Sequence, residues 1–178
     1  YLGDNLLKNG IDIYRKKFKE ENYNAFILLT EVDNPRAFGV AEVKNRQVVR
    51  VVEKPKVPVS NLALIGVYFF DKNVHIAIDN IKPSGRGELE ITDAIQWLID
   101  QGYKVGAEVV KGWWKDTGKP ADILEANRLI LEDIDRDFSG AKVDDVSEIS
   151  GRVKIGMDSE IINSRILGPV IIGEKVKV

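Results

Sequence analysis

Residues 25–30 read Ala-Phe-Ile-Leu-Leu-Thr, a short apolar run that is interrupted by no charged side chain. A continuous apolar run of this length is typical of a β-strand that is covered on both faces. Leu62–Phe70 is a second run of this kind, and Val105–Val110, which contains Glu108, is a further candidate strand. We therefore expect all three segments to be strands, and the first two to be buried.

Helical patterns alternate with these strands. We predict helices over four ranges, 6–21, 72–80, 91–99 and 120–135. Asp71 is a suitable cap for the second of them. The segments Val40–Val43 and Gln47–Glu53 flank a short polar turn, which predicts a β-hairpin. This alternation predicts an α/β fold with a mostly parallel sheet and one antiparallel hairpin.

From about Val143 onward the spacing of aliphatic residues changes to six. The pattern runs through Val143, Ile149, Ile155 and Ile161 and, after a slip of one residue, through Ile166, Ile172 and Val178. A six-residue period indicates a hexapeptide solenoid, usually a left-handed parallel β-helix. The alternative is a plain run of aliphatic strands. We expect a first domain over 1–138 and the start of a β-helix over 143–178, which stacks on further coils or on another subunit.

Composition narrows the class of protein. Hydrophobic residues make up 44% of the 178 residues, and 26 basic against 28 acidic side chains leave a net charge of −2. This balance argues against nucleic-acid binding through bulk electrostatics. The absence of cysteine fits a cytoplasmic protein, and abundant Lys, Glu and Ile favour a thermophilic source. No apolar stretch is long enough to cross a membrane, and no signal peptide opens the chain.

Two aspartates about a hundred residues apart are the first candidate ligands. Asp4 follows Gly3, and Asp116 follows a pair of tryptophans. Each residue could simply cap a helix or close a turn. Together, however, two aspartates from separate loops could bind Mg²⁺ and share it with phosphates and water.

Two further motifs carry groups suited to a phosphorylated sugar. In Glu53-Lys54-Pro55 the lysine could contact a phosphate and the glutamate could accept hydrogen bonds from hydroxyls. Taken without its context, the motif is more often a solvated pair at a strand end. Arg86 lies between two glycines and could grip a phosphate. Glu88, two residues later, could instead be an ordinary acidic residue of a helix start.

In their order along the chain, these motifs resemble the sugar-1-phosphate nucleotidylyltransferases. The similarity is greatest to the glucose-1-phosphate thymidylyltransferase-like group with a C-terminal left-handed β-helix. The motifs that carry the resemblance are Leu-Gly-Asp-Asn at 2–5, Pro-Arg-x-Phe-Gly-Val at 35–40, Glu-Lys-Pro at 53–55, Asn-Leu-Ala-Leu-Ile-Gly-Val-Tyr-Phe-Phe-Asp at 61–71, Gly-Glu-Leu-Glu-Ile-Thr-Asp at 87–93 and Trp-Lys-Asp-Thr-Gly at 114–118.

The resemblance implies a Rossmann-like nucleotidyltransferase domain with a mixed sheet, and a reaction in which a sugar 1-phosphate attacks the α-phosphate of a nucleoside triphosphate. It assigns roles to residues as follows: Asp4 and Asp116 bind Mg²⁺, Lys54 and Arg86 contact the sugar phosphate during catalysis, and Gly39, Glu53 and Tyr68 form the sugar pocket. We add Glu88 to the substrate-binding set because of its place beside Arg86.

One departure from the family pattern is large. The glycine-rich nucleotide loop of the family, which precedes the Gly-Asp-Asn motif, is absent from this sequence. We therefore expect a fragment or split protein that is inactive alone, in a homo-oligomer or with a companion chain that supplies the N-terminal segment. The alternatives are a non-catalytic assembly or regulatory subunit and, less favoured because residues 143–178 contain no histidine base, a hexapeptide acyltransferase.

Overall fold

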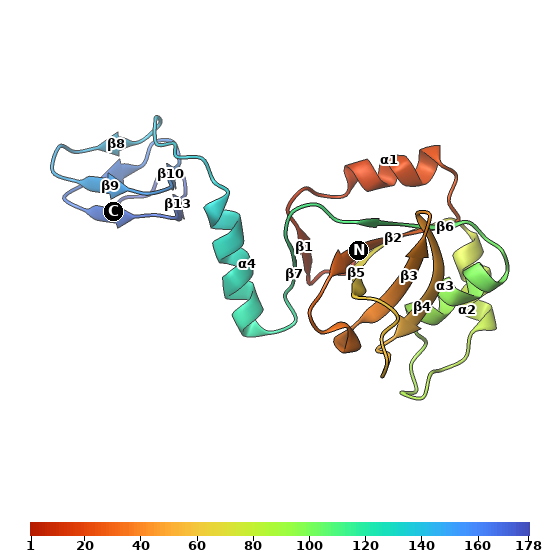
Figure 1. Ribbon diagram of the computed structural model, residues 1–178. Helices are drawn as coiled ribbons and strands as arrows, with labels where there is room; N and C mark the ends of the chain where they lie inside the picture. The colour runs from red at the N-terminus through yellow and green to blue at the C-terminus, as the bar shows by residue number, and fades with distance from the viewer. The chain divides into compact units, whose positions relative to one another are not determined.

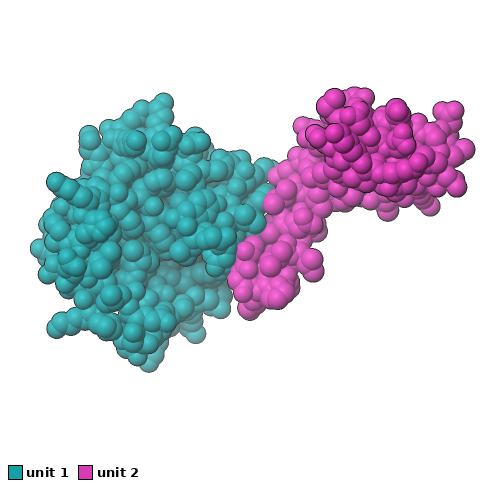
Figure 2. Space-filling model, turned by 180° about the vertical axis from the view of Figure 1, so that it is seen from behind, with its two compact units in different colours: residues 1–116 teal, residues 117–178 magenta.

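The computed structural model describes all residues from 1 to 178, which form two compact units, Tyr1–Asp116 and Thr117–Val178 (Figures 1 and 2). The division at residue 116 places the helix over 120–132 with the second unit, whereas the expected first domain ran to 138. The expected domain boundaries remain a prediction, because compactness alone does not define a domain. No helix combines the length and the apolar character needed to cross a lipid bilayer.

Five strands of the first unit form a sheet that closes on itself in the order β2-β5-β3-β4-β6. Their bounds are β2 Ala25–Glu31, β3 Gly39–Lys44, β4 Gln47–Glu53, β5 Leu62–Phe70 and β6 Val105–Val109. Only β2 and β6 pair in parallel, and all other pairs are antiparallel. The sheet is therefore mixed, and the expectation of a mostly parallel sheet is wrong. Two parallel strands that follow each other in sequence need a long crossover connection between them. The two-residue turn of Asn45 and Arg46 between β3 and β4 is too short for this, so these strands pair antiparallel.

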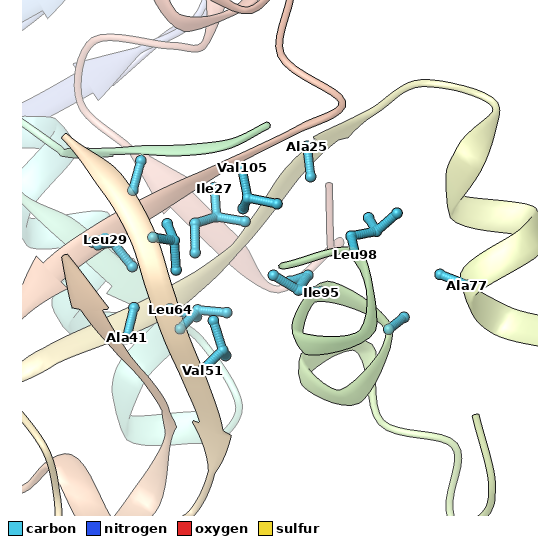
Figure 3. Packing of buried hydrophobic residues seen from close by; sticks show 13 residues of the cluster. Ala25, Ile27, Leu29, Ala41, Val51, Leu64, Ala77, Ile95, Leu98 and Val105 are labelled. Carbon is cyan, nitrogen blue, oxygen red and sulfur yellow. The ribbon is translucent and has the colours of Figure 1, made fainter. Parts of the chain in front are cut away.

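Strand β2 is buried on both faces, as its apolar run predicts. On one face, Ala25, Ile27 and Leu29 join a cluster with Ile95 and Leu98 of helix α3 (Ile91–Asp100), and Ile95 points from the helix toward the strands (Figure 3). Helix α2 (Asn73–Asn80) packs against α3 and adds the buried Ala77 to the same cluster.

The opposite face of β2 forms a second cluster. Phe26 and Leu28 pack there with Tyr14 of helix α1 (Asp12–Glu20) and with residues of β5. The two-sided cover explains why no polar residue interrupts the run before Thr30.

The predicted helix over 6–21 is wrong in its first part. Residues Asn5–Leu7 form strand β1, which pairs antiparallel with β7 (Trp114–Asp116), and helix α1 begins only at Asp12. Gly10 has a φ of +64°, a left-handed conformation that interrupts a right-handed helix. Strand β7 was not predicted either, because a three-residue strand has no measurable periodicity.

The second unit consists of helix α4 (Pro120–Glu132) and six short strands. The strands are β8 Lys142–Val143, β9 Glu148–Ser150, β10 Val153–Ile155, β11 Glu160–Ile161, β12 Arg165–Leu167 and β13 Val170–Ile172. They form three parallel pairs: β8 with β11, β9 with β12, and β10 with β13. A short 3₁₀ turn over Pro35–Ala37 completes the regular elements of the chain.

These parallel pairs bring the six-spaced residues together. Ile155 is paired with Ile172, and Val143 with Ile161, so that paired residues lie 17 or 18 positions apart. The apolar cluster of this unit contains six of the seven residues in the six-residue pattern: Val143, Ile149, Ile155, Ile161, Ile166 and Ile172. The seventh, Val178, is 47% exposed.

The carboxylate of Asp144 accepts hydrogen bonds from two segments of this unit. Its two carboxylate oxygens accept backbone hydrogen bonds from Ser147 and from Asn163, both at 2.8 Å. Hydrogen bonds, first of all from Ser147, lower the pKa of Asp144 below its ordinary 3.8. A lowered pKa stabilises the folded state above the unfolded-state pKa, and this contribution is lost as the pH falls through the folded-state value.

We expect Asp144→Asn to lower the unfolding temperature near pH 7, and the difference from the wild type to shrink as the pH falls below about 3.8. Thermal unfolding followed by circular dichroism from pH 7 to pH 2.5 measures this. The exposed neighbour Asp145, changed to Asn, is the matched control. A difference that stays constant over the whole range would contradict the role of the ionised carboxylate.

Candidate functional site

The first unit contains a cavity of about 230 Å³ between the ends of several strands and the start of α3. Six of the eight expected site residues line it: Asp4, Gly39, Glu53, Lys54, Tyr68 and Asp116. These residues come from both ends of the unit and from β3, β4 and β5. The fold thus gathers most of the expected site into one place, whereas Arg86 and Glu88 do not line the cavity.

Asp4 and Asp116 line the same cavity because β1 and β7 pair. Asn5 lies opposite Asp116 in the antiparallel register, so that Asp4 is its near neighbour on the adjoining segment. Oδ1 of Asp4 accepts a hydrogen bond from Nδ2 of Asn5 at 2.8 Å. Oδ1 of Asp116 is buried and has no hydrogen-bond partner.

A buried carboxylate oxygen without a partner is costly, and a bound cation would satisfy it. No group of three or more His, Cys, Asp or Glu side chains in the chain has an arrangement that could hold a metal ion. Mg²⁺ often takes only one or two protein carboxylates and completes its shell with phosphates and water. The residues present therefore fit a divalent cation of that kind.

Glu53 is held in place by the start of helix α3. The hydroxyl of Thr92 donates to Oε2 of Glu53 at 3.2 Å, and Thr92 itself is buried. Gly39 leaves room for this pair, because a Cβ there would lie 2.7 Å from Cγ2 of Thr92 and 2.9 Å from Oε2 of Glu53. Glycine at position 39 is therefore required by the close approach of two side chains.

Lys54 has an unusual backbone conformation beside the cavity. Its φ is +39°, and its backbone N–H donates to the carbonyl of Phe38 at 3.0 Å. Its ammonium Nζ lies 3.9 Å from Oε1 of Glu53, with the lysine side chain 46% exposed. A left-handed lysine is uncommon and marks a position whose surroundings hold it there.

Tyr68 of β5 presents a phenol to the same cavity. Burial and, to a smaller degree, the charge of Glu53 raise the pKa of Tyr68 to about 12. The phenol therefore stays protonated at neutral pH and remains a hydrogen-bond donor.

Arg86 lies in the loop before α3 and is occupied by its own neighbours. Its guanidinium pairs with Glu88 at 2.6 Å and with Glu90 at 3.1 Å. Ser84 supports this loop by donating its hydroxyl to Glu90 at 2.8 Å. The hydrogen bond to Glu88, with the charge of Glu90 as a further contribution, raises the pKa of Arg86. Glu90 lines the cavity, so Arg86 contacts a residue of the cavity wall without lining the cavity itself.

Ten further residues line the cavity, and four of them have side chains that can form hydrogen bonds but were not among the expected site residues: Asn5, Glu90, Thr92 and Trp114. Trp114 lies two positions before Asp116, and this closeness in sequence was the one indication that it could line the site. Glu90 and Thr92 belong to the motif that follows Arg86, but nothing in their spacing separates them from ordinary residues of a helix start. Asn5 gave no signal of its own, because its role depends on strand pairing.

Residues 2–133 match the family model described as nucleotidyl transferase. The chain belongs to this nucleotidyl transferase family. It is 46% identical to a glucose-1-phosphate thymidylyltransferase of Streptomyces griseus, over 100% of this chain and 50% of that protein. It is 50% identical to a protein of the same name from Streptomyces antibioticus, over 97% of this chain and 49% of that protein. The chain thus spans about half the length of the curated relatives it matches.

Solved structures confirm the mixed α/β nucleotidyltransferase fold. A protein described as a glucose-1-phosphate thymidylyltransferase from Bacillus anthracis, in complex with sucrose, is similar with a TM-score of 0.65 and 39% identity, over 77% of this chain and 55% of that one. A UDP-glucose pyrophosphorylase complexed with UDP-glucose has a TM-score of 0.64 at 22% identity, over 72% of this chain and 54% of that one, and shares the fold.

The close contact at Gly39 gives a direct test of the site's packing. We expect Gly39→Ala to lower the free energy of unfolding by about 1–3 kcal/mol, because Thr92 and Glu53 must move apart. Urea unfolding measures this change. Gly173→Ala is the control, since a Cβ there meets only an ordinary contact at 3.9 Å. Equal stabilities of the two variants would contradict this prediction, because they would show that Thr92 and Glu53 move apart at no cost in free energy.

Proposed function

We propose that this chain provides the sugar-phosphate and metal part of a sugar-1-phosphate nucleotidylyltransferase, most closely of the glucose-1-phosphate thymidylyltransferase type. The reaction joins a sugar 1-phosphate and a nucleoside triphosphate into a nucleoside diphosphate sugar and releases pyrophosphate. The observation that carries the proposal is one cavity lined by six expected residues, with the partnerless Oδ1 of Asp116 in its wall. Family membership and the thymidylyltransferase relatives support it.

Asp4 and Asp116 are the residues that would hold Mg²⁺ in this proposal. The ion neutralises phosphate charge and orients phosphate oxygens when it is bound. The chain's own contribution is to place two carboxylates beside one ribbon, Asp116 on β7 and Asp4 on the segment that leads into β1. Such placement before the reaction costs no reorganisation during it.

Lys54 would bind the phosphate of the sugar substrate as a point charge, while Glu53 and Tyr68 face the sugar hydroxyls. Glu53 accepts hydrogen bonds, and the protonated phenol of Tyr68 donates one. A phosphate oxygen of the sugar 1-phosphate then forms a bond to the α-phosphorus of the triphosphate, and the bond from that phosphorus to pyrophosphate breaks. Alignment and charge neutralisation suffice for this step, and no covalent enzyme intermediate is required.

Arg86 is proposed to join this site only when a phosphate is bound. In the free chain Glu88 and Glu90 hold its guanidinium at 2.6 Å and 3.1 Å. Because Glu90 lines the cavity, a small movement of the loop would exchange these carboxylates for a phosphate. Glu88 would then restrain Arg86 rather than contact the sugar, which modifies its expected role.

For the second unit we propose the start of a left-handed parallel β-helix. The support comes from three parallel strand pairs with registers of 17 or 18 residues, close to three hexapeptides. Glu160 also bridges charges between successive turns, with Lys142 at 3.7 Å and Lys177 at 3.6 Å.

Binding of glucose 1-phosphate to the purified chain tests the proposed function. We expect Lys54→Ala to raise its dissociation constant by about 10- to 100-fold, the usual effect of losing a charged hydrogen bond. Ligand-observed NMR with and without Mg²⁺ measures this. Lys56→Ala is the matched control, because Lys56 is exposed two positions further on and does not line the cavity. Equal affinities of the Lys54 and Lys56 variants would contradict the proposed phosphate contact.

The restraint on Arg86 makes a second prediction. Glu88→Gln removes the partner at 2.6 Å, so we expect the affinity for glucose 1-phosphate to rise by up to about fivefold, the scale of an exposed ion pair. The same NMR titration measures the change, with Glu174→Gln, an exposed glutamate of the second unit, as control. A weaker affinity in Glu88→Gln would instead support a direct contact between Glu88 and the substrate.

A further inference from the structure

The side-chain amide of Asn5 joins three segments of the first unit. Asn5 is the first residue of β1 and is only 6% exposed. Its oxygen Oδ1 accepts two hydrogen bonds, one from the backbone N–H of Gly66 on β5 at 3.0 Å and one from the indole Nε1–H of Trp114 on β7 at 2.7 Å. Its nitrogen Nδ2 donates to Oδ1 of Asp4 at 2.8 Å. One buried amide therefore connects both aspartate-bearing segments to the wall of the cavity.

The orientation of this amide is determined by its partners. The N–H groups of Gly66 and Trp114 can only donate, so they require the oxygen of Asn5 on their side. The NH₂ group is then directed at Asp4, whose carboxylate accepts. A flipped amide would place its donors against two donors and its oxygen against a carboxylate oxygen. With its own orientation determined in this way, the amide presents a donor to one oxygen of the Asp4 carboxylate.

Strand β5 has a glycine, Gly66, where the amide of Asn5 approaches it. A Cβ at Gly66 would lie 2.7 Å from Nδ2 of Asn5 and 2.8 Å from its Cγ. Only glycine lets the amide approach the strand so closely. The backbone carbonyl of Gly66 also accepts a hydrogen bond from the N–H of Leu2 at 2.8 Å. The segment before β1 is thus anchored on both sides of Asp4.

We propose that Asn5 is the positioning residue of the metal site: its amide holds the Asp4 carboxylate and strand β7, with Asp116, in the arrangement in which the two carboxylates bind one divalent cation. This inference rests on the proposed function, since it takes Asp4 and Asp116 to be the ligands. Asn5 acts through these residues rather than by touching the ion. Groups that hydrogen bond to metal ligands set the ligands' orientation, and their removal lowers metal affinity by about 10- to 100-fold.

Manganese binding provides the test. Mn²⁺ is titrated into the full chain in the presence of glucose 1-phosphate, and the free ion is measured by electron paramagnetic resonance. Asn5→Ala is expected to raise the dissociation constant of Mn²⁺ by about 10- to 100-fold. Asn9→Ala is the matched control and is expected to leave it unchanged. Asn9 also links the two segments, through Nδ2 to the carbonyl of Lys111 at 3.0 Å, but it does not line the cavity.

A second variant keeps the test valid if Asn5→Ala folds poorly. Trp114→Phe removes only the indole donor to Asn5 and leaves an aromatic ring in place. It is expected to weaken Mn²⁺ binding less than Asn5→Ala, and the double variant is expected to lose less than the sum of both, because the two residues act through one hydrogen bond. Hydrogen exchange of the Trp114 indole N–H gives a readout without metal: slow in the wild type and fast in Asn5→Ala.

The outcomes separate this inference from the proposed function. Unchanged Mn²⁺ affinity in Asn5→Ala and Trp114→Phe, beside weakened binding in Asp116→Asn, overturns the role of Asn5 alone. Unchanged affinity in Asp116→Asn overturns the metal site itself, and the inference falls with it. The sugar-phosphate part of the proposal is judged independently by Lys54→Ala.

Discussion

The antiparallel pairing of β1 with β7 is the interaction on which the site depends. Three residues on each side bring together segments from the two ends of the first unit. Backbone bonds continue the pairing beyond the strands, because the N–H of Lys8 donates to the carbonyl of Trp113 at 3.2 Å. Without this ribbon the two aspartates would have no common location, and the cavity would lose one wall.

The charges around the cavity explain why a cation is part of the proposal. Four carboxylates line it, from Asp4, Glu53, Glu90 and Asp116, against the single ammonium of Lys54. Such a surface repels a phosphate ester unless further positive charge is added. A divalent ion between the aspartates and a guanidinium released from Glu88 would each supply that charge. The acidic lining and the proposed anionic substrate are compatible only in combination with these cations.

Much of the first unit could be predicted from sequence because its elements are long and strongly patterned. The strands at 25–30 and 62–70 and the helix at 91–99 are confirmed within a few residues, as is the helix at 120–135 in the second unit. Short elements could not be predicted: β1 and β7 have three residues each and are defined by each other. The expected helix over 6–21 was wrong in its first part for the same reason, since local apolar spacing outweighed the signal of Gly10.

Some residues of the candidate site could likewise be predicted from the sequence, whereas others could not. Residues that stand in charged motifs, such as Lys54 and Asp116, were predicted and do line the cavity. The parts that hold them were not predicted, because Asn5 and Thr92 act through hydrogen bonds that exist only in the folded chain. Sequence reasoning also placed Arg86 in the site, whereas the structure pairs it with neighbouring carboxylates, a competition that spacing cannot reveal.

The β1–β7 ribbon also has a consequence for the order of folding. It joins residues more than a hundred positions apart, whereas the β3–β4 hairpin closes over two residues. Closing so large a loop loses more chain entropy, and only a three-residue ladder is gained in return. We expect this ribbon to form after the closed sheet and to open before it. The carboxylate pair would then be the last part of the unit to assemble, and a bound cation would act as the clasp that keeps the chain's two distant segments joined.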